Sequence, residues 1–237
     1  MKDWKLGEIP KGKGTWTTEF EYDENGNVQR ARFVLDNPAK NMRREVELGW
    51  VDDQHGNAYD TICYWESGGG GTVTIPWAIV NNVLYIGTVT QFRVHAGGDV
   101  DNAPRGYMKI GTTDRTQNAT EELAEEVGPN VAEINPPMLL AGDPVNMNTA
   151  VFWTPGKDEG NSFHSVEVDP NYLVDDGNDS MRFVDGLVAP EGGESITRCQ
   201  FNPWHVAVRN QDGLTIVGIA RLMAQLEDEG RLFISHT

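Results

Sequence analysis

Short runs of alternating hydrophobic and polar residues dominate the first third of this chain and predict β-strands. Residues 15–22 and 28–35 are two such runs, and the turn sequence Asp-Glu-Asn-Gly-Asn at residues 23–27 lies between them. Because Asn-Gly between strand-like runs is a strong hairpin signal, we expect a small amino-terminal sheet within residues 1–45. A further strand pair is expected in residues 46–65.

Other strand-like stretches lie in the middle of the chain, and a helical pattern lies near its end. The apolar stretch 73–94 is broken at Asn81 and Asn82 and predicts two strands. Apolar residues recur at helical spacing in residues 214–226 and predict a helix that packs over a sheet. Further strands are expected at 138–153, 163–174 and 181–189, and an acidic loop is expected at 174–180.

The most informative sequence is the acidic stretch at residues 121–128, Glu-Glu-Leu-Ala-Glu-Glu-Val-Gly. If this stretch is a helix, three glutamates share one face: Glu122, Glu125 and Glu126. Another face is apolar and can be buried: Ala119, Leu123 and Val127. Gly128 supplies a helix stop, so we expect an amphipathic helix that ends near this glycine.

The glutamate face has two interpretations. Like charges this close repel one another, so the face is either well solvated or neutralised by a cation. Mg²⁺ binds carboxylate oxygens, retains several waters and usually bridges to substrate phosphates. Glu121 also has two interpretations, since Asn118-Ala-Thr-Glu121 fits a helix capping box and the Glu121 carboxylate could equally lie at a metal.

These glutamates and their surroundings resemble the sequence box of the Nudix hydrolase family, and within it that of the ADP-ribose and ADP-sugar pyrophosphatases. Gly106 is similar to the first glycine of the box, and residues 122–128 match its end, Glu-(apolar)-x-Glu-Glu-x-Gly. Residues 83–93 resemble the strand that precedes the box and ends in an arginine. The Pro-Arg-Gly sequence that ends at Gly106 resembles the start of the box.

The box departs from the family pattern in three respects. The spacing between Gly106 and Gly128 is one residue longer than in the family. The isolated glutamate in the middle of the box is absent, because its position falls on Thr112 or Thr113. The arginine of the box is replaced by Glu121. The resemblance therefore implies the fold and leaves the activity open.

The fold implied by the resemblance is α+β, an α/β/α sandwich with a mixed central sheet and a glutamate-bearing helix. This domain would span residues 46–237, and residues 1–45 would form a β appendage. The implied activity is hydrolysis of the diphosphate linkage in a nucleoside diphosphate derivative such as ADP-ribose or an ADP-sugar, with Mg²⁺ or Mn²⁺ as cofactor. Relatives often place the general base on a loop away from the box, and Asp176 in the acidic loop is similar in position and charge.

The resemblance also implies specific site residues. The implied metal ligands are Glu121, Glu122, Glu125 and Glu126. The implied catalytic residues are Glu122, Glu125 and Asp176. The implied substrate contacts are Arg93, Arg105 and Gly106.

Charge and cysteine content limit the expected partners and compartment. A formal net charge of −17 disfavours nucleic acids and anionic membranes as partners, so a small nucleotide substrate is expected instead. No run approaches the roughly 20 apolar residues that span a bilayer. Cys63 and Cys199 stand far apart without a paired-cysteine motif, and the cytoplasm is the simplest compartment. A homodimer through residues 1–45 is expected from the resemblance.

Two other functions remain compatible with the sequence. A Nudix fold that lacks the mid-box glutamate and the box arginine could bind a nucleotide derivative without cleaving it. The acidic helix could also be only a solvated surface of a structural protein. In that case Mg²⁺ would not shift thermal stability beyond a control of matched ionic strength.

Overall fold

The structure is a computed structural model that describes residues 15–37, 42–52, 58–66, 70–93, 97–108, 113–128, 131, 135–140, 160–185, 199–210 and 212–231. The chain divides into two compact units, each with its own sheet. The first unit comprises Met1–Gly70, Tyr107–Thr113 and Phe152–Gly160. The second comprises Gly71–Gly106, Asp114–Val151 and Asn161–Thr237.

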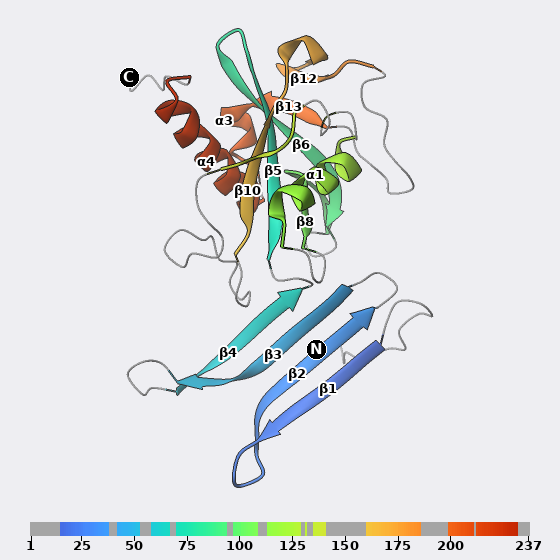
Figure 1. Cartoon of the computed structure of the whole chain (residues 1–237), viewed down its shortest axis with the longest axis vertical. Coiled ribbons are helices and arrows are strands. Elements are labelled where there is room, and N and C mark those ends of the chain that lie inside the picture. Colours follow the sequence, from blue (N-terminus) through green and yellow to red (C-terminus); the bar gives the residue numbers. More distant parts are fainter. Residues whose placement is uncertain are drawn as a thin grey trace. The chain divides into compact units, whose positions relative to one another are not determined.

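The first unit contains an antiparallel sheet of four strands in the order β1-β2-β3-β4 (Figure 1). Its strands are β1 Thr15–Tyr22, β2 Val28–Asn37, β3 Met42–Asp52 and β4 Ala58–Glu66. The predicted hairpin between β1 and β2 is confirmed. The Asp23 carboxylate accepts the backbone N–H groups of Asn25 at 2.9 Å and Asn27 at 2.7 Å, and Gly26 has a φ of +81°. A side-chain acceptor and a glycine therefore fix this turn.

Strand β3 crosses the expected domain boundary at residue 45. It pairs with β2 through residues 42–49 and with β4 through residues 44–52. Residues 46–65, which we expected in the main domain, thus extend the amino-terminal sheet. Nη2 of Arg32 on β2 lies 3.3 Å from Oε2 of Glu47 on β3, an ion pair that links these strands. A two-stranded hairpin alone is marginally stable, so β3 and β4 stabilise it by enlarging the sheet.

The second unit contains a mixed sheet in the order β11-β12-β13-β6-β5-β10-β9, with β7 paired to β6 and β8 paired to β5. Strand β10 runs parallel to β5, whereas β6 is antiparallel to β5, β7 and β13. The strands are β5 Gly71–Val80, β6 Val83–Arg93, β7 Gly98–Asn102, β8 Arg105–Tyr107, β9 Met138–Leu139, β10 Ser162–Glu167, β11 Leu173–Gly177, β12 Ser180–Phe183 and β13 Gln200–Pro203. The helices are α1 Arg115–Glu126, the 3₁₀ helix η2 Pro170–Tyr172, α3 Trp204–Ala207 and α4 Gly213–Asp228.

Helices α1 and α4 cover opposite faces of this sheet around β5 and β10 (Figure 1). Side chains of a strand alternate between the two faces, so neighbouring residues of β5 enter different cores. Ile75 and Trp77 pack in one core with Ile219 of α4. Ala78 packs in the other core with Leu123 of α1. The predicted fold class, a mixed central sheet between helical layers with a separate β-sheet at the amino terminus, is confirmed.

Two of the strongest local predictions in this unit are confirmed. Strands β5 and β6 are joined at Asn81 and Asn82, whose φ angles of 51° and 64° lie in the left-handed region that asparagine tolerates. Helix α4 covers the predicted helix at residues 214–226. The asparagine pair and the helical spacing of apolar residues are both local patterns in continuous sequence, so they could be recognised without knowledge of the tertiary contacts.

The prediction of one strand at residues 163–174 followed by a loop is wrong. Strand β10 ends at Glu167, and Asp169 then caps η2 by accepting the Asn171 N–H at 2.8 Å. The acidic stretch after η2 is a hairpin of β11 and β12, whose turn lies at Asn178 and Asp179 with φ angles of 53° and 60°. A proline-containing turn thus interrupts the run of apolar residues.

The remaining predicted strands are shorter than expected where they are described. The stretch 138–153 contains β9, and its residues 141–153 lie outside the described part of the chain. The stretch 181–189 contains most of β12, and its residues 186–189 also lie outside the described part. In the parts of the chain that the structure describes, no helix is both long and apolar enough to cross a membrane.

Candidate functional site

Helix α1 carries the predicted glutamates and begins earlier than we expected. Its N-cap is Asp114, whose carboxylate accepts the backbone N–H of Gln117 at 2.9 Å. The capping box predicted at Asn118 is therefore wrong. Asn118 is buried inside the helix interface and donates its side-chain amide to the hydroxyl of Thr72 on β5 at 2.8 Å. This buried bond ties the first turns of α1 to the sheet.

The amphipathic pattern predicted for α1 is confirmed. Ala119, Leu123 and Val127 are buried, whereas Glu125 is exposed. Gly128 follows the helix with a φ of +137°, which favours glycine, and donates its N–H to the Leu123 carbonyl at 3.2 Å. The apolar face holds α1 on the sheet, and the glutamates project from the rest of the helix surface.

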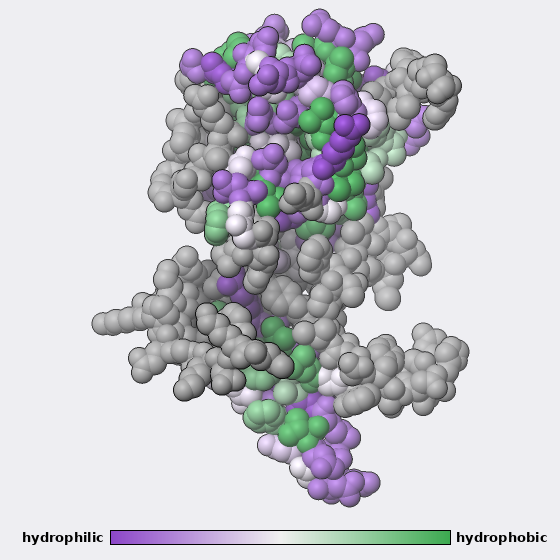
Figure 2. Space-filling model, turned by 180° about the vertical axis from the view of Figure 1, so that it is seen from behind, coloured by the Kyte–Doolittle hydropathy of each residue, from purple (hydrophilic) through white to green (hydrophobic). Residues whose placement is uncertain are grey.

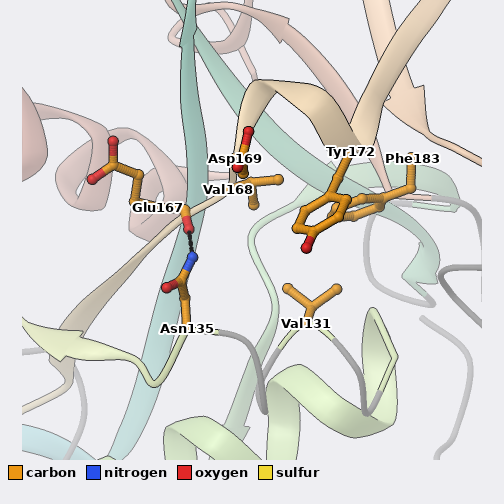
Figure 3. Close-up of a pocket in the computed structure, with 7 residues that line it drawn as sticks. All are labelled: Val131, Asn135, Glu167, Val168, Asp169, Tyr172 and Phe183. Atoms are coloured by element: carbon orange, nitrogen blue, oxygen red, sulfur yellow. Dashed lines mark hydrogen bonds between the residues drawn. The ribbon is translucent and has the colours of Figure 1, made fainter.

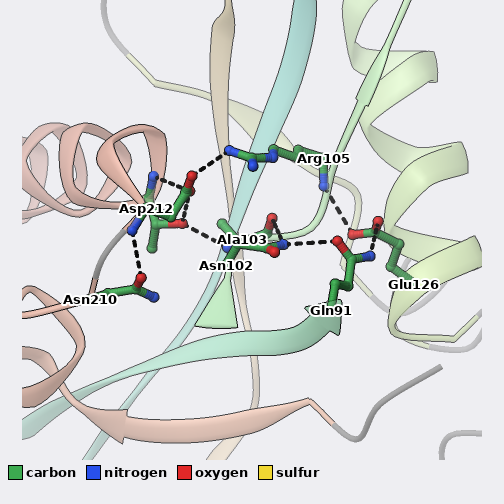
Figure 4. A network of polar contacts seen from close by, with 8 residues as sticks. Gln91, Asn102, Ala103, Arg105, Glu126, Asn210 and Asp212 are labelled. Carbon is green, nitrogen blue, oxygen red and sulfur yellow. Dashed lines mark hydrogen bonds and ion pairs between the residues drawn. The ribbon is translucent and has the colours of Figure 1, made fainter. Parts of the chain in front are cut away.

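Two of these glutamates approach the backbone of residues 105–106, in the short strand β8. Gly106 leaves the space that the Glu122 carboxylate occupies, because a Cβ built on this glycine would overlap with that carboxylate. Oε2 of Glu126 accepts the backbone N–H of Arg105 at 3.1 Å (Figure 4). The structure thus brings together Glu122, Glu126 and Gly106.

The side chain of Arg105 extends from this point toward helix α4 (Figure 4). Its Nη1 donates to Oδ1 of Asp212 at 2.7 Å. Asp212 is the N-cap of α4, and its Oδ2 accepts the N–H of Thr215 at 2.9 Å and the Thr215 hydroxyl at 2.6 Å. The Arg105 backbone therefore contacts α1 while its guanidinium contacts the start of α4.

Further hydrogen bonds close a ring around this segment. Nε2 of Gln91 on β6 donates to Oε1 of Glu126 at 2.6 Å, and Nδ2 of Asn102 donates to Oε1 of Gln91 at 3.3 Å. The Ala103 N–H donates to the hydroxyl of Thr215 at 2.8 Å. In order, the ring contains Glu126, Gln91, Asn102, Ala103, Thr215, Asp212 and Arg105. Our sequence analysis assigned a role to only two of its members, Glu126 and Arg105.

Several other residues of the predicted site and box have contacts elsewhere, are exposed, or lie outside the described part of the structure. Glu121 accepts the side-chain amide of Gln117 at 2.9 Å, one turn earlier on α1. Arg93 is the last residue of β6, and its side chain lies outside the described part of the structure. Thr112 also lies outside the described residues, and Thr113 is exposed.

Asp176, the predicted general base, lies on strand β11. Its Oδ1 is 3.1 Å from Nε of Arg182 on the neighbouring strand β12. Arg182 also binds Asp185 at 2.8 Å, so two carboxylates share this arginine. Strands β12, β13 and β6 separate β11 from β5, on which α1 packs. Asp176 therefore lies on a strand that is separated in the sheet from β5, the strand on which the glutamate helix α1 packs.

Glu122 and Glu126 provide the type of ligand that a hard divalent cation requires. Mg²⁺ is usually held by one or two protein carboxylates, and waters and substrate phosphates complete its octahedron. Two carboxylates beside the backbone of residues 105–106 fit that description. Within the described ranges, no three side chains of His, Cys, Asp or Glu lie close enough together to hold a metal by themselves. Glu122 and Glu126 thus supply two carboxylates of the kind that binds Mg²⁺.

A buried polar layer lies on the face of β5 and β10 that α1 covers. His164 of β10 is in register with Thr74 of β5, and both side chains are buried. Neither nitrogen of the His164 ring has a hydrogen-bond partner among the described residues, nor does the Thr74 hydroxyl. Burial, and then the charge of Arg115, lowers the pKa of His164 to about 4, although Asp114 acts in the opposite direction. His164 is therefore neutral at pH 7.

Acidification from pH 7 to about 4 is expected to destabilise the fold by about 3 kcal/mol through His164. The imidazole pKa is 6.5 without perturbation and about 4 in the folded protein. Between these values the unfolded chain binds the proton and the folded chain does not, so stability falls as the pH falls. Urea unfolding at pH 7 and pH 4 measures this loss. The non-titrating variant His164→Leu should lose this part of the pH dependence, and an unchanged dependence would contradict the assignment.

A small cavity lies between η2 and the segment that follows α1 (Figure 3). It is lined by Val131, Asn135, Glu167, Val168, Asp169, Tyr172 and Phe183. The side-chain amide of Asn135 donates to the backbone carbonyl of Glu167 at this site. The cavity volume of about 10 Å³ is the space of a single water molecule. A nucleotide does not fit in a cavity of this size.

Comparisons with known proteins address the fold. No protein-family model matches the sequence, and no curated protein matches it. A solved structure described as an ADP compounds hydrolase is similar at 11% sequence identity and a TM-score of 0.51, over 93% of this chain and 97% of that chain. A structure described as a NUDIX hydrolase from Listeria monocytogenes is 11% identical over 69% of this chain and 98% of that chain, with a TM-score of 0.44. The likeness to the first of these structures concerns the fold alone: a mixed central sheet with helices, similar to that of the Nudix hydrolases, and a separate antiparallel sheet at the amino terminus.

Proposed function

We propose that this protein hydrolyses the diphosphate linkage of a nucleoside diphosphate derivative, such as ADP-ribose or an ADP-sugar, with Mg²⁺ or Mn²⁺. The observation that carries the proposal is the approach of Glu122 and Glu126 to the backbone of residues 105–106. The likeness to a structure named an ADP compounds hydrolase supports the choice of substrate class.

In this proposal Glu122, Glu125 and Glu126 hold the cation, with Glu121 as a further ligand. No three of these carboxylates, all in the described part of the chain, lie close enough together beforehand, so they would gather around the cation only when metal and substrate bind. Glu122 and Glu126 are already directed at one place, and the exposed Glu125 is accessible to a ligand that arrives from solvent. A bound Mg²⁺ would neutralise the diphosphate and lower the pKa of a coordinated water. A glycine at position 106 allows the Glu122 carboxylate to lie directly against the backbone.

The reaction adds one water across the P–O–P bridge. The water oxygen forms a bond to one phosphorus, the bond from that phosphorus to the bridging oxygen breaks, and two phosphomonoesters result. Asp176 remains the proposed acceptor of the water proton. Its ion pair with Arg182 keeps the carboxylate in place on β11. A general base must come within hydrogen-bond reach of the water, so binding of substrate would have to bring the two parts together.

The proposed substrate contacts are Arg93, Arg105 and Gly106. Arginine suits phosphate because its planar group donates several hydrogen bonds at once. The Arg105 guanidinium binds Asp212 at the start of α4 at 2.7 Å, so in this proposal it exchanges that ion pair for a phosphate when substrate binds. Arg93 ends β6, the strand that also carries Gln91.

Incubation of the full chain with ADP-ribose and Mg²⁺ or Mn²⁺ tests the proposal directly. Ion-exchange chromatography should show AMP and ribose 5-phosphate, and chelation of the metal should abolish both products. ADP-glucose and a dinucleotide in parallel reactions identify the preferred substrate. A complete lack of metal-dependent products from the whole panel would refute hydrolysis of this class.

Binding without cleavage is the second candidate function. The mid-box glutamate is replaced by Thr112 or Thr113 and the box arginine by Glu121, which removes two supporting positions of the family pattern. Under this alternative a nucleotide derivative raises the melting temperature while no product forms. The same reaction panel, repeated as a thermal-shift experiment, separates the two functions.

A homodimer through the amino-terminal sheet and a cytoplasmic location complete the proposal. Phe20 and Leu48 flank Ala31 in the sheet register and are 50% and 40% exposed. Figure 2 shows hydrophobic residues at the surface of this sheet, beside the hydrophilic β1–β2 turn. We expect Leu48→Lys to shift the protein from dimer to monomer in sedimentation velocity. A monomeric wild-type protein at micromolar concentration would contradict the dimer.

A further inference from the structure

The carboxylate of Glu126 is held from two sides by neutral donors. Its Oε1 accepts the Gln91 side-chain amide at 2.6 Å, and its Oε2 accepts the Arg105 backbone N–H at 3.1 Å (Figure 4). A carboxylate has about four lone-pair sites, so these two hydrogen bonds are compatible with a cation on the same group. Both of these donors are uncharged, so neither bond itself neutralises the Glu126 carboxylate.

The orientation of Gln91 is itself fixed by a buried neighbour. Nδ2 of Asn102 donates to Oε1 of Gln91 at 3.3 Å and to the Ala103 carbonyl at 3.0 Å, and Asn102 is fully buried. A rotation of the Gln91 amide by 180° would place its oxygen against Glu126 and its nitrogen against the Asn102 amide. Both contacts would then be repulsive, so Asn102 directs the Gln91 N–H group at Glu126.

We propose that Gln91 is a positioning residue for the cation site, which acts through Glu126. This inference rests on the proposed function, because it concerns the cation that Glu126 would hold. Removal of a group that hydrogen-bonds to a metal ligand typically lowers metal affinity or activity about 10- to 100-fold. A side chain in this position needs to donate without bringing a positive charge, and among long side chains glutamine meets that requirement.

The test is Mn²⁺ binding to the full chain, measured from the electron paramagnetic resonance signal of free Mn²⁺. Gln91→Met keeps the length of the side chain and removes the donor, and it should raise the apparent dissociation constant for Mn²⁺ about tenfold or more. Gln225→Met is the matched control, since Gln225 donates to Glu229 at 2.8 Å on the exposed surface of α4. The control should bind Mn²⁺ as the wild-type protein does.

A double variant distinguishes action through Glu126 from a general structural effect. Glu126→Gln should weaken Mn²⁺ binding, and adding Gln91→Met to it should cause no further loss. If Gln91→Met weakens binding equally in both backgrounds, or leaves the wild-type affinity unchanged, the positioning role is refuted while the cation site stands. If the wild-type protein does not bind Mn²⁺ and Glu126→Gln changes nothing, the proposed function fails together with this inference.

Discussion

Replacement of Glu126 by glutamine is expected to lower metal-dependent hydrolysis by about a hundredfold or more and to leave the fold intact. Groups that only orient a ligand are worth about 10- to 100-fold, so removal of a proposed ligand's charge should cost at least the upper end of that range. The side chain keeps its size, although its single amide oxygen can accept from only one of the two donors, the Gln91 amide or the Arg105 N–H. The measurement is the initial rate of nucleotide cleavage at saturating Mg²⁺, with circular dichroism to check the fold.

The control for this experiment is Glu227→Gln. Glu227 is an exposed carboxylate on α4, so the variant makes the same change in net charge away from α1. It should retain wild-type activity. Full activity of Glu126→Gln would show that the cation is held without this carboxylate. The parallel variants Glu122→Gln and Glu125→Gln would then rank the remaining ligands. The larger loss of hydrolysis rate would show whether the partly buried Glu122 or the exposed Glu125 contributes more to the cation site.

Local patterns predicted the elements whose signals lie within a few neighbouring residues. The Asn-Gly hairpin, the Asn81–Asn82 turn and the glutamate helix are examples. The start of α1 was wrong because Asp114 and Asn118 both suit an N-cap, one turn apart. Burial decided between them: Asn118 bonds to Thr72 on β5, which a one-dimensional pattern does not contain.

The hydrogen-bond ring could not be predicted, because its members are distant in sequence. Arg105 and Asp212 are 107 residues apart, and Gln91 and Glu126 are 35 apart. A glutamine within a strand gives no local sign of its partner. Asp212 lies three residues before Thr215, a spacing typical of a helix cap, but nothing nearby indicates that its second oxygen binds Arg105.

Phe163→Ala is expected to destabilise the second unit by about 3–5 kcal/mol, the usual cost of removing a buried aromatic ring. Phe163 is fully buried on β10, between β5 and α4. A Cβ at Gly218 of α4 would already lie 3.2 Å from the ring, so α4 is packed closely against it, and the surroundings should relax only partly into the cavity that the variant creates. The guanidinium of Arg221 lies 4.9 Å from the ring centroid, and this contact is lost as well.

Hydrogen exchange of the β5 and β10 amides measures this loss for the second unit by itself, which is useful because the chain has two compact units. A loss of 3–5 kcal/mol corresponds to roughly a hundredfold to several thousandfold faster exchange of the slowest amides. Phe92→Ala is the matched control, since Phe92 is 66% exposed on β6 and should change exchange little. Equal effects of the two variants would contradict a stabilising role of the packing between Phe163 and α4.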